Sequence, residues 1–122
     1  MPESAEATLL RIFVAENDRL HGRLLCHALV EKAQEMKMAG ATVLPAPVGF
    51  GQSRMVRHEL NVDAGPYLPV VIEIVDTEEN IMRFLPAIDG MIDSGLVTLE
   101  KVRAVFYGKA AQPSAAEAPH LP

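Results

Sequence analysis

The strongest constraint on the fold is the way the hydrophobic period alternates along the chain between two residues and about 3.6 residues. The segments with the strand period are residues 8–14, 41–46, 69–75 and 102–107, and those with the helix period are residues 23–39 and 76–95. The order is strand–helix–strand twice, which is the split βαβ arrangement of ferredoxin-like domains. We therefore predict an α+β fold, ferredoxin-like βαββαβ, with a four-stranded antiparallel sheet and two helices on one face.

The length of 122 residues suits one domain, which we place at residues 8–108. Residues 1–7 are small and polar, and residues 109–122 are rich in alanine and proline. Neither end can bury much apolar surface, so we expect both to be flexible.

Alternation along the strands predicts two different faces of the sheet. Val70, Ile72 and Ile74 form one apolar set, as do Leu10, Ile12 and Val14. The opposite face is predicted to hold Leu9, Phe13, Val71, Val75, Val105 and Tyr107, together with Arg11, Glu73 and Arg103. Because a face left to water should be mostly polar, we expect this face to pack on another copy of the chain. Pairing of Glu73 with Arg11 or Arg103 would allow the charges to be buried.

The helix boundaries carry their own signals. The first helix should end at Gly40, a C-cap glycine. The second should open with a capping box between Asp76 and Glu79 and end at Gly95.

The composition excludes several classes of protein. A net charge of −5 and a sequence pI of about 5.3 do not fit a nucleic-acid binder, which would carry a basic surface. No apolar run has the length of a signal peptide or a membrane span, so we expect a cytoplasmic protein without direct membrane insertion. The single cysteine, Cys26, rules out an internal disulfide and is expected to be a reduced thiol.

The residues offer no catalytic or metal-binding set. The four histidines lack the spacing of metal ligands, and no nucleophile motif is present. Glu16 and Asp18 are more typical of a turn than of an acid–base pair. We therefore expect a protein that is not an enzyme; ligand turnover lost on mutation of Asp18 or His21 would favour the enzyme alternative.

The segment Gly49–Phe50–Gly51 is the most informative polar feature. Two glycines allow a close backbone approach to a ligand, and successive N–H groups can surround an anion. Gln52, Ser53 and Arg54 add side-chain donors. Taken alone, the segment is better explained as a plain turn, since no helix follows it as in a dinucleotide fingerprint.

Several longer strings resemble the PII nitrogen-signalling proteins. Residues 39–43 (AGATV) lead to Gly49–Phe50–Gly51, and residues 68–75 (LPVVIEIV) return from the long loop. A closer similarity is to the PII-like family of bacterial and archaeal proteins, which are sometimes fused to or encoded beside fluoride channels. That similarity lies in residues 16–22 (ENDRLHG), 28–33 (ALVEKA), 74–79 (IVDTEE) and 95–102 (GLVTLEKV). The resemblance covers residues 8–107.

The resemblance implies a homotrimer with its sheets facing the centre and an adenine nucleotide in each cleft between subunits. The ligand contacts it implies are Gly49, Phe50, Gly51, Gln52, Ser53 and Arg54, with Gly95, Leu96, Val97 and Thr98 across the subunit boundary in a loop before the last strand. The basic residues that contact polyphosphate in PII proteins have no counterpart in Gly95–Thr98 or at Phe106–Gly108. AMP or ADP is therefore favoured over ATP.

Two functional hypotheses follow from the resemblance. In the first, a trimeric regulator binds the nucleotide and signals through the loop 53–67 to a membrane channel or transporter. In the second, the chain is a ligand-independent accessory module for such a partner. A change in loop proteolysis on adding nucleotide would distinguish them.

Overall fold

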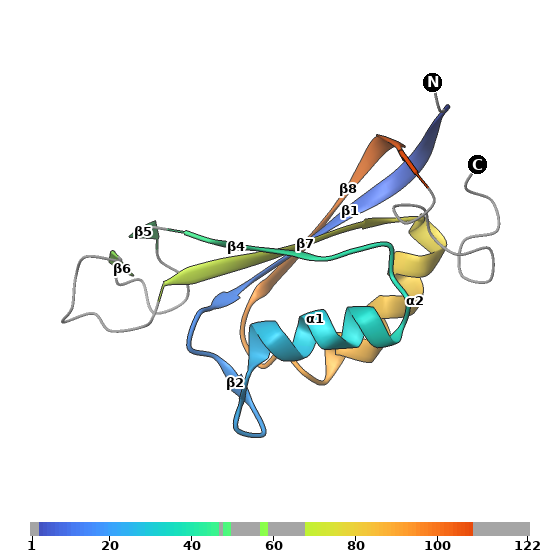
Figure 1. Ribbon diagram of the computed structural model, residues 1–122. Helices are drawn as coiled ribbons and strands as arrows, with labels where there is room; N and C mark the ends of the chain where they lie inside the picture. The colour runs from blue at the N-terminus through green and yellow to red at the C-terminus, as the bar shows by residue number, and fades with distance from the viewer. Residues whose placement is uncertain (1–2, 47, 50–56, 59–67, 109–122) are drawn as a thin grey trace.

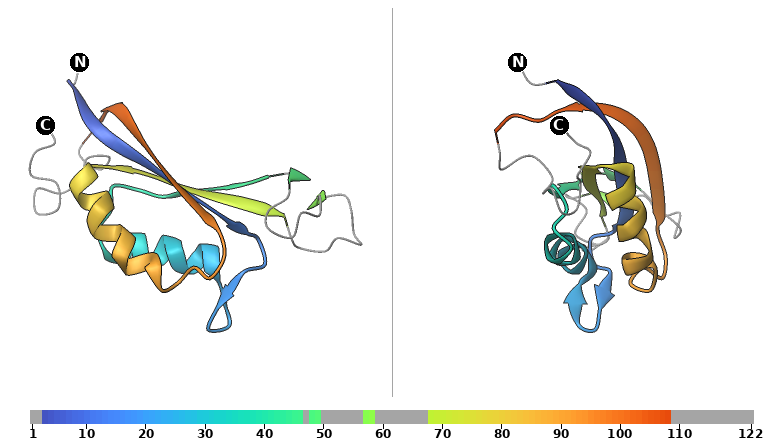
Figure 2. Two further views of the ribbon diagram at one scale, coloured as in Figure 1. Left: turned by 180° about the vertical axis from the view of Figure 1, so that it is seen from behind. Right: turned by 90° about the vertical axis from the view of Figure 1, so that its right-hand side faces the viewer.

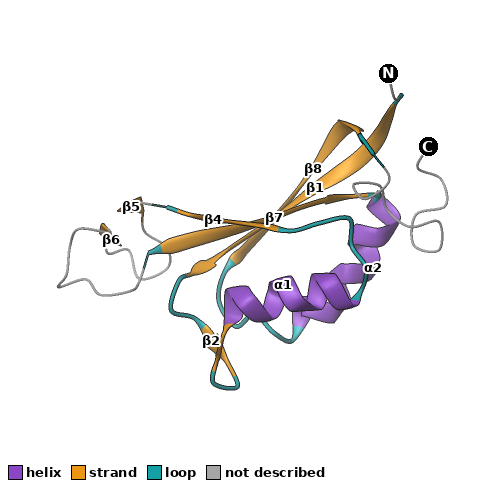
Figure 3. Cartoon of the chain, in the orientation of Figure 1, coloured by secondary structure: helices purple, strands orange, loops and turns teal. Residues whose placement is uncertain are grey.

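The computed structural model describes residues 3–46, 48–49, 57–58 and 68–108, and its central feature is a twisted four-stranded sheet (Figure 1). The strands are β1 (Ser4–Ala15), β4 (Thr42–Pro45), β7 (Pro69–Asp76) and β8 (Leu96–Val105). Their order is β4-β7-β1-β8, and all three neighbouring pairs are antiparallel. Helices α1 (Leu25–Glu35) and α2 (Glu78–Asp89) both lie on one face (Figures 1 and 3). The predicted ferredoxin-like fold is confirmed.

The core between the sheet and the helices is the one that alternation predicts. Leu10, Ile12 and Ile72 are fully buried, and the neighbouring even-numbered positions of β1 and β7 are buried with them. The helices contribute Leu25, Leu29, Ala33, Ile81, Phe84 and Ile88. Cys26 is a buried free thiol in α1.

Helix α1 begins later than its periodicity suggests. Strands β2 (Arg19–Leu20) and β3 (Arg23–Leu24) form a small hairpin ahead of it. The two turn residues, His21 and Gly22, have φ of 50° and 83°, the combination required by a type I′ turn. The helix therefore starts at Leu25 instead of residue 23, because the two preceding residues belong to the hairpin.

Helix α1 also ends earlier than predicted, and Gly40 is not the residue that closes it. The left-handed position after the helix belongs to Lys37, with φ of 58°. The backbone N–H of Lys37 donates to the carbonyl oxygen of Gln34 at 3.1 Å, and that of Met38 donates to Ala33 at 3.0 Å. These two bonds form a Schellman motif, which satisfies the last carbonyl groups of the helix without a glycine.

The predicted capping box at the start of α2 is wrong. Thr77 is the N-cap, and its hydroxyl accepts a hydrogen bond of 3.0 Å from the backbone N–H of Asn80. Asp76 lies one residue earlier, fully buried, at the end of β7. Its carboxylate accepts hydrogen bonds from the backbone N–H groups of Thr77 and Ala39 instead, at 2.7 and 2.8 Å.

The end of α2 and the start of the last strand also differ from the prediction. The helix ends at Asp89, with Gly90 as its C-cap, and β8 begins at Leu96, six residues before the predicted start at 102. In the register of β8 with β1, Val105 lies opposite Ser4 and Arg103 opposite Glu6. Paired residues point to the same face, so Val105 and Arg103 lie on the helix side and not on the open side of the sheet. Tyr107 lies beyond the end of β8.

The beginning of β1 and the end of β8 form an arm that extends past the helices (Figure 2). Residues 4–7 pair with Val102–Val105 in this arm, and Ala7 is buried. Most of the N-terminal segment that was expected to be flexible is therefore a strand. The expected flexible segment 109–122 lies outside the described residues.

Candidate functional site

The first half of the predicted ligand site lies at the edge of the sheet where β4 ends. Beyond Pro45, strand β5 (Val48–Gly49) pairs with β6 (Arg57–His58), and Gly49 lies opposite Arg57. This short hairpin stands at the far end of β4 and β7 from the start of α2 (Figure 1). The remaining predicted contacts of this half, residues 50–54, lie outside the described residues, as does most of the loop 53–67.

The second half of the predicted site is a strand and not a loop. Leu96, Val97 and Thr98 begin β8 and lie opposite Phe13, Ile12 and Arg11. Only Gly95 precedes the strand. A Cβ atom added to Gly95 would lie 2.7 Å from the carbonyl oxygen of Phe13, so the close packing of two backbones requires glycine here.

The two halves lie at the same end of the sheet but on opposite edges. Pro45 of β4 pairs with Val70 of β7, and Val70 pairs with Val14 of β1. Gly95, just before β8, lies next to Val14 on the side away from β7. Three strand spacings of about 4.8 Å separate the two edges by roughly 14 Å. One chain therefore does not bring Gly49 and Gly95 together around a small ligand.

The open face of the sheet is the side opposite α1 and α2, and three rows of residues cross the middle of it from strand to strand. The rows are Leu44–Val71–Phe13–Leu96, Thr42–Glu73–Arg11–Thr98 and Val75–Leu9–Glu100. The first row is entirely apolar, and Leu44 and Leu96 are 43% and 58% exposed. The open face thus combines an uncovered apolar row with a row of charged and hydroxyl groups.

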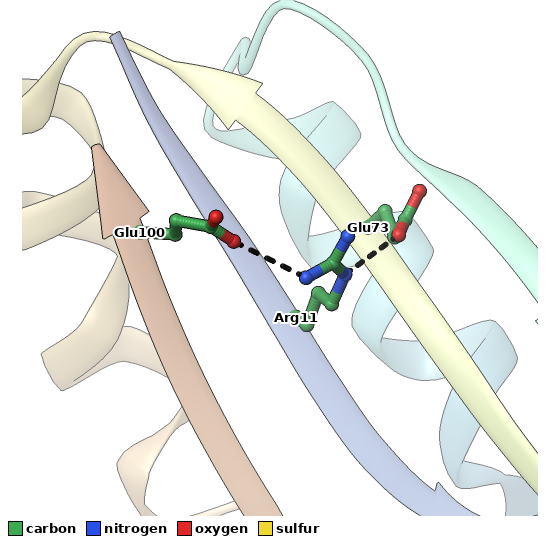
Figure 4. Close-up of polar contacts among 3 residues, drawn as sticks. All are labelled: Arg11, Glu73 and Glu100. Carbon is green, nitrogen blue, oxygen red and sulfur yellow. Dashed lines mark hydrogen bonds and ion pairs between the residues drawn. The ribbon is translucent and has the colours of Figure 1, made fainter. Parts of the chain in front are cut away.

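Two ion pairs that share Arg11 occupy the middle of the open face (Figure 4). The Nε of Arg11 donates a 2.8 Å hydrogen bond to Glu73 on β7, as predicted, and the Nη1 lies 3.4 Å from Glu100 on β8. The hydrogen bond to Glu73 raises the pKa of Arg11, and burial opposes that rise. The alternative partner, Arg103, instead donates to the Ser4 hydroxyl at 2.7 Å. Arg11 with two carboxylates leaves the face with one surplus negative charge.

The histidines that the structure describes are scattered. His21 lies in the β2–β3 turn and His27 on the exposed side of α1. Among the described residues, no group of three His, Cys, Asp or Glu side chains could hold a metal ion. No helix in the same part of the chain has the length and apolarity needed to cross a membrane.

A polar pocket that the sequence motifs do not indicate lies at the other end of the sheet. A pocket of about 330 Å³ lies between the β1–β8 arm and the first turn of α2. Its charged lining residues are Glu6, Glu78, Lys101 and Arg103. The alternation of Lys101 and Arg103 is a signal for a shared face, but the hydrophobic pattern predicts a strand start after Lys101 and a flexible segment at Glu6.

Sequence comparison gives a family match over most of the chain. The model of the family DUF190, described as "Uncharacterized ACR, COG1993", matches residues 7–104. A UPF0166 protein of Aquifex aeolicus (strain VF5) is 41% identical over 98 residues, covering 80% of this chain and 92% of that protein. A UPF0166 protein of Methanocaldococcus jannaschii is 32% identical over 95 residues, covering 77% and 87%.

Similar solved structures have the PII-like fold. CPII of Thiomonas intermedia K12, bound to ADP and bicarbonate, has a TM-score of 0.64 at 14% identity and covers 87% of this chain and 95% of its own. CPII bound to ADP, AMP and bicarbonate has a TM-score of 0.65 at 13% identity, covering 87% and 94%. A protein of Thermus thermophilus, described as PII-like signaling, has a TM-score of 0.64 at 23% identity, covering 84% and 93%. At these identities, the likeness establishes the fold.

Proposed function

The chain belongs to the DUF190 family and has a PII-like fold, and on this basis we propose that it is a regulatory protein that forms a homotrimer and binds an adenine nucleotide between its subunits. Binding and conformational response, without chemical turnover, are its activity. The loop 53–67 carries the response to a membrane channel or transporter, on the cytoplasmic side. The observation that most supports the proposal is the placement of the two ligand-site halves on opposite edges of the sheet.

The apolar row of the open face supports the homotrimer. Leu44, Phe13 and Leu96 present contiguous apolar surface on the face of the sheet opposite α1 and α2. Such surface favours association, because each Å² of apolar surface removed from water lowers the free energy by about 25 cal/mol. The charges of Arg11 and Glu73 neutralise each other within the chain, so this pair can enter an interface already hydrogen-bonded.

Assembly can be tested with one substitution on the open face. Phe13→Glu places a charge in the apolar row and should convert trimers to monomers in light scattering coupled to size-exclusion chromatography. The matched control is Met82→Glu, because Met82 is 52% exposed on α2, on the other side of the molecule. A monomeric wild-type protein, or a Phe13→Glu variant that remains trimeric, would contradict the proposed assembly.

The nucleotide proposal rests on the ligand-site residues and on what similar proteins bind. CPII structures contain ADP, and ADP with AMP. The proposed contacts in this chain are Gly49–Arg54 of one subunit and Gly95–Thr98 of the next. Because the basic residues that hold polyphosphate in PII proteins are missing from the second segment, we favour AMP or ADP over ATP.

Thermal-shift measurements with AMP, ADP and ATP, followed by calorimetry, test this proposal. A ligand at about 100 times its dissociation constant stabilises the folded state by roughly 2.7 kcal/mol, which moves the melting temperature measurably. Gly51→Val should abolish binding by blocking close backbone approach, whereas Gly40→Val should not, since no atom lies within 4 Å of a Cβ added to Gly40. If all three nucleotides fail to bind, the ligand-independent accessory module becomes the better hypothesis.

A further inference from the structure

The pocket between the β1–β8 arm and α2 is separate from the proposed nucleotide cleft. Glu6 lies seven residues before Phe13, against which Gly95 packs. At about 3.3 Å per residue along a strand, the pocket stands roughly 23 Å from that end of the sheet. Figure 1 shows the same separation, with the β1–β8 arm and the start of α2 at the opposite end from β5 and β6.

Strand register explains why four of the polar lining side chains gather on one surface. Thr8 lies opposite Lys101, and Glu6 lies opposite Arg103. Paired positions share a face, and this face is the one that looks toward the helices. The first residue of α2, Glu78, faces them from across the pocket.

The pocket has equal numbers of positive and negative side chains, but these side chains do not form ion pairs with one another. Two carboxylates and two cationic groups line it, yet none of Glu6, Glu78 and Lys101 forms an ion pair in the described part of the chain. Directly opposite charges on paired strands usually attract, but the guanidinium of Arg103 donates to the Ser4 hydroxyl at 2.7 Å instead of to Glu6. The pocket therefore offers separate donor and acceptor groups to a ligand.

We propose that this pocket binds a small zwitterion of the α-amino acid class. The ligand carboxylate accepts hydrogen bonds from Lys101 and Arg103, and its ammonium group donates to Glu6 and Glu78. A volume of about 330 Å³ lies at the small end of ligand pockets, which suits a molecule of this size. The hydroxyl of Thr8, a buried residue, supplies a further polar group at the sheet surface.

Charge complementarity selects a zwitterion over a simple anion or cation. An anion would meet the two carboxylates as well as the two cationic groups, and a cation would meet the reverse conflict. Only a ligand that carries both charges satisfies both pairs at once. A nucleotide carries surplus negative charge and would be disfavoured, so this site and the proposed nucleotide cleft are predicted to differ in ligand class.

The test begins with the full-length protein and the twenty common L-amino acids, each screened alone by thermal shift. Calorimetry then compares the strongest binder with its N-acetyl derivative, which lacks the ammonium, and its methyl ester, which lacks the carboxylate. At least one amino acid should raise the melting temperature, and both blocked derivatives should bind at least ten-fold more weakly. No shift with any amino acid, or full affinity of either blocked derivative, would overturn the proposal.

Variants then assign the binding to this pocket. Lys101→Gln and Glu78→Gln should each raise the dissociation constant at least ten-fold. The controls Lys37→Gln and Glu79→Gln should bind as the wild type does, because neither residue lines the pocket and Glu79 shares the first helical turn with Glu78. Equal weakening by Glu79→Gln and Glu78→Gln would refute the site. Should Lys101→Gln lose its folded circular dichroism spectrum, Arg103→Gln provides the same test from the other basic side chain.

Discussion

The buried carboxylate of Asp76 should anchor the loop after α1 to the start of α2. One of its oxygens, Oδ1, accepts hydrogen bonds from the Thr77 backbone N–H at 2.7 Å and from the Asn80 side chain at 2.9 Å. The other oxygen, Oδ2, accepts from the Ala39 backbone N–H at 2.8 Å. Asp76 is fully buried, and no ion pair reaches it in the described part of the chain. The hydrogen bonds from these three donors are therefore the main interactions that offset the desolvation of the buried carboxylate.

Asp76→Asn should disable one of these contacts selectively. The amide oxygen can replace Oδ1 and keep the bonds to Thr77 and Asn80, but the amide nitrogen then faces the N–H of Ala39. Two donors confront each other, so one hydrogen bond to a charged acceptor is lost, at about 1.5–3 kcal/mol. Asp76→Ala removes all three contacts and should destabilise the fold by about 3–5 kcal/mol, because each buried donor left without an acceptor costs about 1–3 kcal/mol.

Urea unfolding, followed by circular dichroism, measures the change in the free energy of unfolding for both variants. The protomer concentration is held fixed, because assembly contributes to stability. Amide hydrogen exchange locates the effect: Asp76→Asn should speed exchange at Ala39 and leave Thr77 protected. Asp93→Asn, at an exposed turn position, is the control and should be within about 0.5 kcal/mol of the wild type. A loss below about 0.5 kcal/mol in Asp76→Asn, or equal loss of protection at Ala39 and Thr77, would refute the selective role of Oδ2.

Two further substitutions test the packing of β8 and the ion pair of the open face. Gly95→Ala should destabilise the protein by about 1–3 kcal/mol in urea unfolding, because its Cβ would lie 2.7 Å from the Phe13 carbonyl oxygen. Gly90→Ala, with open space around the added atom, should not show this loss. A double-mutant cycle with Arg11→Met and Glu73→Gln should give a small favourable coupling free energy, because solvent screens a cross-strand ion pair whose side chains are partly exposed. A coupling indistinguishable from zero would show that the pair does not stabilise the sheet.

The core strands could be predicted from the sequence because each has one clearly apolar face. In β7, Val70, Ile72 and Ile74 alternate with partly exposed positions, so the period alone assigns the buried side. The same holds for the middle of β1. The order of helices and strands then follows, and with it the ferredoxin-like fold.

The assignment of β8 failed because neither of its faces is distinctly apolar. Leu96 and Val102 point to the open side and Val97 and Leu99 to the helix side, and each set is interrupted by charged residues. As an edge strand with partial exposure on both faces, β8 obtains its register from pairing with β1 and not from its own alternation. An error in register by one residue moves every side chain of a strand to the other face. For this reason the sequence predicts the wrong face for Arg103 and Val105.

The same error explains what the sequence could and could not establish about binding sites. The resemblance to PII-like proteins predicts Gly49 and Gly95 as residues of a ligand site, and glycine permits a backbone or a ligand to approach closely at such positions. Distance across the sheet is a property of strand order, so only the structure shows that the two residues lie on opposite edges. The charged pocket depends on register even more directly, because Glu6 and Arg103 are 97 positions apart in the chain and meet only through the pairing of β1 with β8. Sites formed within one segment are therefore accessible to sequence reasoning, whereas sites formed between strands depend on the register that joins them.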